Sequence, residues 1–176
     1  MNQKMKQVPP SYPNAYPDMG IASLIETERP HLLQYACYRL GSPDDAEDAV
    51  QEVFLQIHAR SKNRGNQPPA DLRNYLYRSL SNFCTDRLRR QKVRQFIPIE
   101  QASQLSEEQV ENFEQEFRLI SALLAAIPEE QAEVIRLRIH GNNSFREIAE
   151  ILEIPVTTVK SRFQYGIEKI RKGMNF

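Results

Sequence analysis

The stretch SFREIAEILEIPVTTVKSRFQYGIEKIRK, residues 144–172, decides the fold of the C-terminal part of this chain. Ser144 followed three residues later by Glu147 is the pattern of a capping box, which predicts that a helix begins there. Pro155 suits the start of a second helix, because its missing N–H falls where a helix has no internal partner. Apolar side chains then recur every three or four residues and predict one buried face: Val159, Phe163, Ile167 and Ile170.

The second helix of this pair also carries polar and basic side chains, which fall largely off the apolar stripe: Thr157, Thr158, Lys160, Ser161, Arg162 and Gln164. Two short helices joined by a tight turn, the second with such a face, are typical of a helix-turn-helix. In that motif the second helix enters the major groove of DNA. The stretch therefore predicts a DNA-binding module.

The formal charge of the 176-residue chain is zero, but its charges are arranged in alternating blocks. Residues 21–58 carry seven acidic and two basic side chains, and residues 97–133 carry nine acidic and one basic. Residues 59–96 carry ten basic and two acidic side chains, and residues 134–176 carry eight basic and four acidic. The two basic blocks predict two separate electrostatic contacts with nucleic acid.

The cysteines and the hydropathy pattern predict a cytoplasmic protein. Cys37 and Cys84 form no CxxC pair and lie in apolar helical surroundings, so we expect reduced, partly buried thiols. No apolar run approaches the ~18 residues of a membrane span, and the N-terminus lacks the hydrophobic core of a signal peptide. We therefore expect no membrane insertion.

Periodicity and turn signals predict an all-α fold of two small helical domains joined by an acidic flexible linker. We expect a Pro-rich flexible tail at residues 1–18 and a first domain at residues 19–97. The linker is expected at residues 98–116, which are acidic, Gln-rich and poor in apolar side chains. The second domain, residues 117–176, contains the helix-turn-helix.

Within the first domain three helices are predicted. One covers residues 21–40, with a kink at Pro30, and a second runs from the start signal at residues 42–45 through residue 58. Residues 59–70 are expected to form a basic loop, after which Asp71 can cap a helix that ends in the basic run RLRRQKVR. In the second domain, helical periodicity resumes at residue 117, a further helix follows Pro128, and residues 141–143 form a turn.

Three segments occur in a fixed order: DDAEDAVQEVFLQIH at residues 44–58, NYLYRSLSNFCTDRLRRQ at residues 74–91, and residues 120–172. Together they resemble the sigma factors of bacterial RNA polymerase, specifically the extracytoplasmic-function (ECF) class. DDAEDAVQEVFLQIH, residues 44–58, is similar to the family's core-binding helix, and NYLYRSLSNFCTDRLRRQ, residues 74–91, is similar to its promoter-opening segment. Residues 120–172, including IPEEQAEVIRLRIHG, resemble the helices that precede and form the family's DNA-binding domain. The resemblance covers roughly residues 21–172 apart from the linker.

This resemblance implies that the chain binds core RNA polymerase and directs promoter-specific initiation as an alternative sigma factor. It implies contacts with the clamp coiled coil and the flap of the polymerase, with promoter DNA, and with an anti-sigma factor that covers these surfaces until a signal arrives. Asp48, Gln51 and Glu52 match the positions that contact the clamp. An acidic, amide-bearing stripe opposite an apolar face suits a basic partner helix, although a solvated helix face is the alternative interpretation.

The second segment resembles the element that recognises and melts the minus-10 region, which needs cations for phosphates and aromatic surfaces for flipped bases. The residues implied in this contact are Lys62, Asn63, Arg64, Tyr75, Arg78, Asn82, Arg89 and Arg90, with Tyr77, Lys92 and Arg94 close by. Residues 62–66 match in position the family's specificity loop. Core packing is the alternative role for Tyr75, which stands where the family has Trp, and Ser79 and Ser81 also depart from the pattern.

The resemblance also implies that the C-terminal helix reads the minus-35 element through Thr157, Thr158, Lys160, Ser161, Arg162 and Gln164. Lys160 and Arg162 suit guanine edges or phosphates. Glu153 stands where the family usually has a turn glycine, so we expect a strained or altered turn. Pro155 replaces the usual Ser or Thr cap, so we expect fewer satisfied N–H groups at the start of this helix.

Other functional classes fit these patterns less well. A dimeric helix-turn-helix transcriptional regulator, the main alternative, predicts a ligand-binding, receiver or dimerisation element where this chain has a second basic block. An enzyme is not expected, because His31, His58 and His140 are far apart in sequence and no glycine-rich phosphate loop occurs. No catalytic residue, metal, cofactor or small-molecule substrate is therefore predicted. An adaptor made of amphipathic helices would not need the basic clusters at residues 87–94 and 160–172.

Overall fold

The computed structural model describes residues 21–63, 71–94 and 109–174. These residues form helices and no strand, which confirms the predicted all-α fold. The helices are α1 (Ile21–Leu40), α2 (Pro43–Asn63), α3 (Leu72–Arg94), α4 (Gln109–Ala125), α5 (Glu129–Ile139), α6 (Phe145–Leu152) and α7 (Val156–Met174). Among the described helices, none combines the length and the apolar character needed to cross a bilayer.

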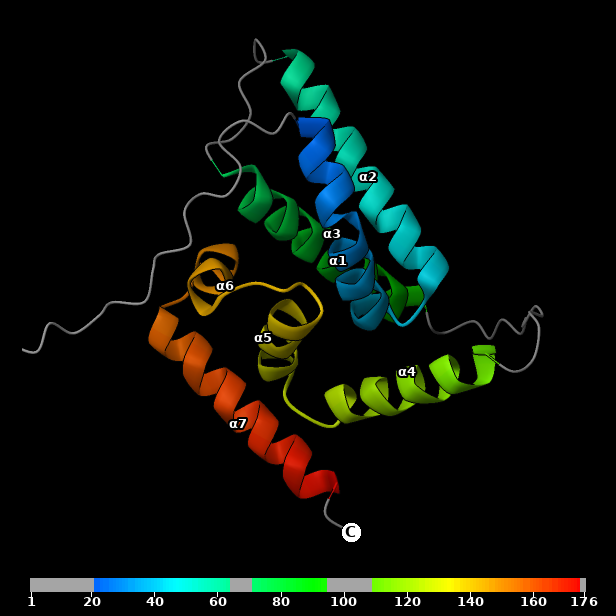
Figure 1. The fold of residues 1–176 in the computed structure, drawn as a ribbon, viewed down its shortest axis with the longest axis vertical. Helices are drawn as coiled ribbons and strands as arrows, with labels where there is room; N and C mark the ends of the chain where they lie inside the picture. The colour runs from blue at the N-terminus through cyan, green and yellow to red at the C-terminus, as the bar shows by residue number, and fades with distance from the viewer. Residues whose placement is uncertain (1–20, 64–70, 95–108, 175–176) are drawn as a thin grey trace, which may run out of the picture.

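The first three helices pack on one another, and their ends follow the local signals in the sequence (Figure 1). Pro30 lies inside α1 without ending it, and the helix stops at Gly41, which adopts a left-handed φ of 76°. The hydroxyl of Ser42 accepts a hydrogen bond from the N–H of Asp45 at 3.3 Å, which supports the first turn of α2. The carboxylate of Asp71 accepts the N–H of Asn74 at 2.9 Å, as the predicted cap requires.

Two predicted boundaries are wrong because helix-forming residues extend the helices. α2 continues to Asn63, so residues 59–63 are not part of the predicted basic loop, and residues 64–70 lie outside the described part. α4 begins at Gln109, so residues 109–116 are helical rather than linker. Both segments are rich in Ala, Arg, Lys, Gln or Glu, which have high helix propensity. The predicted tail and the rest of the predicted linker lie outside the described residues.

The last three helices form a second group. α5 follows Pro128 as predicted, and the turn expected at residues 141–143 separates α5 from α6, with Asn142 at a φ of 49°. α4 packs beside this group, and a second, small apolar core joins them to Tyr38 of α1. Its other members are Leu124, Ile127, Ala132 and Ile135. Gly166 of α7 allows a close approach to α5, because a Cβ there would lie 2.7 Å from Cδ1 of Ile135.

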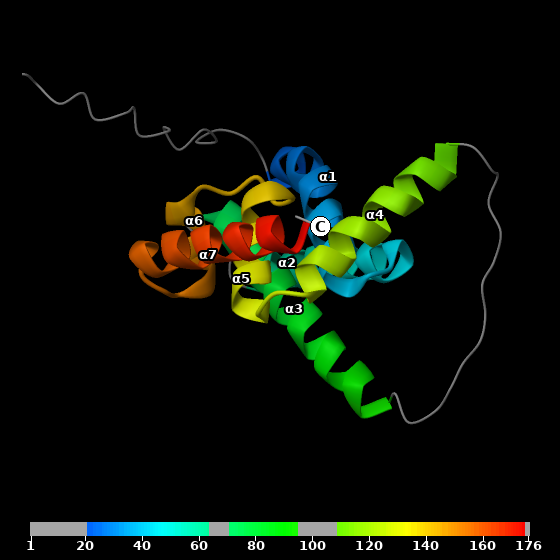
Figure 2. The ribbon, with the colours of Figure 1, turned by 90° about the horizontal axis from the view of Figure 1, so that it is seen from below.

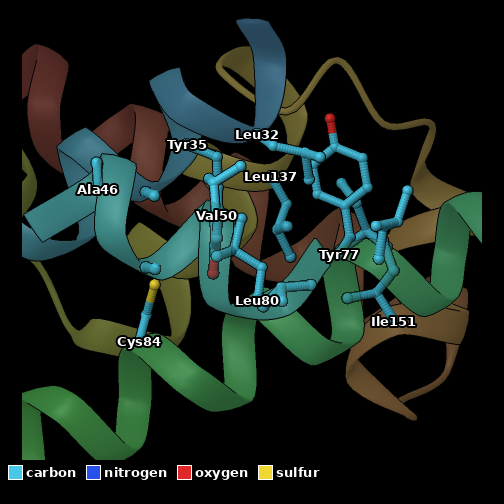
Figure 3. Packing of buried hydrophobic residues seen from close by; sticks show 14 of the residues in the cluster. Leu32, Tyr35, Ala46, Val50, Tyr77, Leu80, Cys84, Leu137 and Ile151 are labelled. Atoms are coloured by element: carbon cyan, nitrogen blue, oxygen red, sulfur yellow. The ribbon is translucent and has the colours of Figure 1, made fainter. Parts of the chain in front are cut away.

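The two helix groups share one hydrophobic core, which the sequence did not predict. Figure 3 shows Tyr77 and Leu80 of α3 in the same cluster as Leu137 of α5 and Ile151 of α6. The buried thiol of Cys84 belongs to this core, and both cysteines are free as expected. The C-terminal end of α3 and the N-terminal end of α4 project away from the body (Figure 2).

Candidate nucleic-acid interfaces

The helix-turn-helix begins with the predicted capping box. The hydroxyl of Ser144 accepts the N–H of Glu147 at 3.2 Å, and the carboxylate of Glu147 accepts the N–H of Ser144 at 2.6 Å. These two bonds satisfy N–H groups that the first turn of a helix leaves without partners. The start of α6 therefore depends on residues within one helical turn of one another.

The turn between α6 and α7 contains a strained residue. Glu153 caps α6 in the left-handed conformation, with φ 56° and ψ 42°. A side chain with a Cβ in this region costs about 1 kcal/mol relative to glycine. The N–H groups of Glu153 and Ile154 both donate to the carbonyl of Ala149, which closes the end of α6. The expected strained turn is thus present, at the position where the family usually has glycine.

The predicted buried stripe of α7 is confirmed. Val159 is fully buried, while Phe163, Ile167 and Ile170 are partly buried against the two cores. Phe163 also packs edge to face on Phe145 of α6, with ring centroids 5.3 Å apart. These contacts fix the rotation of α7 about its axis and so decide which side chains face outward.

The outward face of α7 carries all six predicted DNA contacts near the N-terminal end of the helix. Four are exposed and two, Thr158 and Arg162, are partly buried: Thr157, Thr158, Lys160, Ser161, Arg162 and Gln164. The hydroxyl of Ser161 donates to the carbonyl of Thr157 at 2.9 Å. Pro155 precedes α7, and its carbonyl accepts the N–H of Val159 at 3.1 Å. The structure therefore presents these side chains together, as a major-groove reader requires.

The basic side chains predicted on α3 divide into two sets. Asn82, Arg89 and Arg90 are exposed on α3. Arg89 pairs with Asp86 at 3.1 Å on the helix surface, a contact of little strength. Arg78, by contrast, contacts α6: Nη1 lies 3.0 Å from the carboxylate of Glu153, and Nη2 donates to the carbonyl of Glu150.

The two tyrosines predicted beside the minus-10 contacts have different surroundings. Tyr75 is partly buried against the core, with its hydroxyl bonded to Arg60 and the Arg60 guanidinium 5.8 Å from its ring. Tyr77 is fully buried, and its hydroxyl donates to the carboxylate of Glu28 at 3.2 Å. Burial, with the nearby Glu28 charge, raises the pKa of Tyr77 well above its usual range. The expectation that Tyr77 offers a surface to bases is therefore wrong, because it lies on the buried face with Leu80, three residues on.

Arg73 of α3 is a contact that the sequence did not indicate. Its side chain is 13% exposed, its Nε lies 2.8 Å from Glu28, and its Nη1 lies 2.9 Å from Glu147. Nη1 also donates to the side chain of Asn143 at 2.7 Å. A buried arginine of this kind joins α1, α3 and the start of α6. In the sequence, Arg73 is simply a basic residue three positions before Leu76 of the apolar stripe, and no local pattern indicates its partners.

The predicted docking residues lie on the exposed side of α2. Asp48, Gln51 and Glu52 are all exposed, opposite the buried Val50 and Val53. The structure adds Leu55, whose 57% exposure makes it an apolar side chain in this polar face. The face thus combines acidic, amide and apolar groups.

Of the predicted minus-10 residues near the end of α2, Lys62 and Asn63 lie in its last turn, and Arg64 lies outside the described residues.

Comparisons with known proteins match most of this chain. Residues 24–94 match the family model Sigma-70 region 2, and residues 123–172 match Sigma-70, region 4. The chain is 29% identical to the ECF RNA polymerase sigma factor SigW of Bacillus subtilis (strain 168), over 98% of this chain and 95% of that protein. It is 31% identical to the ECF RNA polymerase sigma factor SigE of Mycolicibacterium smegmatis, over 76% of this chain and 54% of that one.

Solved structures share the fold. The sigma factor RpoE in complex with the anti-sigma factor NepR from Bartonella quintana matches with a TM-score of 0.65 and 18% identity, over 88% of this chain and 98% of that one. CnrH in complex with the cytosolic domain of CnrY matches with a TM-score of 0.64 and 21% identity, over 88% of this chain and 86% of that one.

Proposed function

This chain belongs to the ECF class of sigma-70 factors, and we propose that it binds core RNA polymerase and directs promoter-specific initiation under anti-sigma control. The observation that carries the proposal is the match to both sigma-70 regions, each of which presents an exposed basic or polar helix surface, on α3 and on α7. Sigma factors are initiation factors, so no catalytic role is assigned to any residue. The site of action is the cytoplasm, where the polymerase works.

Core polymerase binds at the exposed face of α2. Asp48, Gln51 and Glu52 provide carboxylate and amide groups for a basic helix of the clamp, and Leu55, one turn beyond Gln51, provides an apolar contact. Charge-assisted hydrogen bonds to such groups are stronger than neutral ones and also speed the encounter. A face of this composition is better suited to a protein partner than to DNA, because its acidic groups would repel phosphates.

The minus-10 region binds along the projecting half of α3. Asn82, Arg89 and Arg90 are exposed on this helix. We assign Lys62, Asn63 and Arg64 to the same contact on the basis of the sequence. Tyr75 contributes only through the exposed part of its side chain, since it is partly buried against the core. Arg78 contributes only after its contacts with α6 are broken. Cations of this kind capture the phosphates of the melted strand.

The minus-35 element binds at the outward face of α7. Lys160 and Arg162 contact phosphates or guanine edges, while the hydroxyl and amide groups of the remaining residues complete the readout: Thr157, Thr158, Ser161 and Gln164. An anti-sigma partner is supported by a solved structure of the same fold, the sigma factor RpoE in complex with the anti-sigma factor NepR.

Run-off transcription with core polymerase on a library of genomic promoter fragments tests this function. We expect transcripts that start at a defined subset of fragments and that require both core and this chain. If the chain neither binds core nor directs initiation, yet binds duplex DNA as a dimer, it acts instead as a dimeric helix-turn-helix transcriptional regulator.

A further inference from the structure

Arg60 and Tyr75 contact each other where the end of α2 meets the start of α3. Arg60 lies in the last turn of α2, and Tyr75 lies in the first turn of α3. The guanidinium of Arg60 donates to the hydroxyl of Tyr75, and its Cζ lies 5.8 Å from the centroid of the ring. The two residues are 15 positions apart, and no motif in the sequence assigned Arg60 to DNA. The contact therefore adds a second side chain to the surroundings of Tyr75.

The guanidinium of Arg60 holds the ring of Tyr75 from its hydroxyl end. Atoms stacked on a ring face lie about 3.5–4.0 Å away, whereas this Cζ is 5.8 Å from the centroid and an attached nitrogen reaches the hydroxyl. Arg60 therefore does not cover the centre of the ring. Tyr75 is only partly buried against the core, so the exposed part of its side chain remains open to a ligand.

The side chain of Tyr75 is fixed before any ligand binds. Its N–H donates to the carbonyl of Asp71 at 3.1 Å, which sets its backbone at the start of α3. A tyrosine has a few staggered directions about χ1, and the bond from Arg60 to the hydroxyl favours one of them. A ring that is already held loses less conformational freedom when a ligand orders it. Arg60 thus preorganises the outer end of this ring.

The contact depends on tyrosine at position 75, where the resembled family has Trp. A tyrosine hydroxyl can accept a hydrogen bond as well as donate one, whereas the indole N–H of Trp only donates. Trp could therefore not accept the bond from an arginine. Arg60 and the hydroxyl of Tyr75 form a matched pair that the residue usual in the family would not allow.

The charge of Arg60 remains available to a ligand. Other arginines of the first helix group pair with carboxylates, as Arg73 does with Glu28 at 2.8 Å. Within the described part of the chain Arg60 forms no ion pair, and its side chain is exposed. A guanidinium has several N–H donors, so the bond to Tyr75 leaves others for a phosphate.

We propose that Arg60 and Tyr75 form a clamp for one nucleotide of the melted strand, in which the ring of Tyr75 stacks on the base and Arg60 contacts a neighbouring phosphate. Arg60 is also a positioning residue, because it holds the ring for the base. Bases stack on an aromatic side chain whatever their identity, and cations bind the backbone beside them. The clamp rests on the function proposed above, since it needs the minus-10 region to be opened at α3.

Binding of a single strand to the holoenzyme, the complex of core polymerase with this chain, tests the clamp. The probe is a fluorescein-labelled oligonucleotide of about 12 nucleotides with the nontemplate minus-10 sequence of a promoter found by run-off transcription. Each nucleotide is replaced in turn by an abasic one, which keeps the phosphate and removes the base. With the wild type we expect a position where this change weakens binding roughly tenfold, the strength of stacking on one aromatic side chain.

Arg60→Met and Tyr75→Phe should each reduce the abasic penalty at that same position to about threefold or less, because a ring that is not held must be ordered by the base. The double variant should reduce it no further, since the two residues act as a unit. Arg60→Met should also lower the slope of log binding constant against log salt concentration by about 0.7 in magnitude, the value for one phosphate of a single strand. Tyr75→Phe should leave that slope unchanged.

Arg118→Met is the matched control, because Arg118 is an exposed arginine of α4 far along the chain from this contact. It should keep both the abasic penalty and the salt slope of the wild type. Circular dichroism checks the fold of each variant. A partly unfolded chain would weaken binding of the intact and abasic probes alike, so it would not imitate a penalty lost at one position.

The clamp is overturned if the wild type shows no such position, or if either Arg60→Met or Tyr75→Phe keeps the full penalty at every position. A wild-type salt slope in Arg60→Met would also overturn it. In each case the proposed function stands if the wild type directs initiation with core polymerase. The proposed function itself fails if the wild type neither binds core nor initiates, which the run-off assay measures independently of the clamp.

Discussion

Arg73 of α3 contacts Glu147 of α6 at 2.9 Å, so a single ion pair joins α3 to the capping box of the helix-turn-helix. The two residues are 74 positions apart in the sequence. Glu147 both completes the local cap and accepts this distant arginine, which couples the start of α6 to the first helix group.

Arg73→Met is expected to destabilise the fold by about 3 kcal/mol, because it leaves the buried carboxylate of Glu28 without its cationic partner. Urea unfolding followed by circular dichroism measures the change. Arg118→Ala is the control, since the Arg118–Glu114 pair is exposed on α4 and should change stability by no more than about 0.5 kcal/mol. Equal effects of the two variants would contradict a structural role for the buried cluster.

Gly166→Ala should destabilise the second helix group by about 1–2 kcal/mol. The added methyl would lie 2.7 Å from Cδ1 of Ile135 and 3.2 Å from Cβ of Gln131, and this overpacking outweighs the gain in helix propensity. Gly173→Ala in the same helix meets no atom within 4 Å, so it should be neutral or slightly stabilising. Thermal unfolding of the two variants gives the comparison, and a stabilised Gly166→Ala chain would refute the close approach of α7 to α5.

His140 should make the fold less stable in mild acid. Burial, with the nearby Arg136 charge, lowers the pKa of His140 to about 4, while its ring stacks on Tyr38 at a centroid distance of 3.8 Å. The unfolded chain takes up this proton near pH 6.5 and the folded chain does not, so this contribution is present above pH 6.5 and is lost as the pH falls towards 4. We expect a loss of about 2 kcal/mol between pH 7 and 5.

Urea unfolding at pH 7 and pH 5, on the wild type and on His140→Phe, checks this linkage. Phenylalanine keeps the stacking on Tyr38 but cannot bind a proton, so the variant should lose less stability over the same interval. An NMR titration of His140 with a midpoint near 6.5 in the folded chain would contradict the expectation.

Charge reversal at Asp48 and Glu52 to Lys should weaken core polymerase binding by roughly tenfold or more, because it replaces attraction to a basic clamp helix with repulsion. Both side chains are exposed, so circular dichroism should show an unchanged fold. Glu26→Lys, at an exposed position on α1, is the matched control and should leave core affinity unchanged. Unchanged affinity in the double variant would remove the docking role of this face of α2.

Lys160→Ala and Arg162→Ala should each weaken binding of the holoenzyme to duplex that contains the minus-35 element. If the lost contact is to a phosphate, the slope of log binding constant against log salt concentration should fall in magnitude by about one. If it is to a base, binding should weaken by about 1–3 kcal/mol and the preference for sequence should relax. Filter binding over a range of salt concentrations distinguishes the two roles. Lys172→Ala, at the far end of α7, is the control, and an equal loss there would indicate general electrostatic attraction instead of readout by these two residues.

Much of the candidate site was predictable from local patterns. The stripe of Val159, Phe163, Ile167 and Ile170 predicted the exposed side of α7, because a helix with one buried face exposes the opposite one. Four of the six residues assigned to DNA are exposed there, and Thr158 and Arg162 are partly buried. The same reasoning placed Asp48 and Glu52 on the outside of α2. It did not place Tyr77, because a tyrosine beside an apolar stripe suits either the core or a base, and only its contact with Glu28 decides between them.

The sequence by itself determined the helices, the capping box at Ser144 and the strained turn at Glu153, because these depend on residues within about one helical turn of each other. Only the tertiary structure decided that the two helix groups share a core and that Arg73 and Arg78 contact α6. An amphipathic pattern shows that a face is buried but does not identify the helix that covers it. Likewise, the sequence around a charged side chain does not identify an ion-pair partner that is distant along the chain.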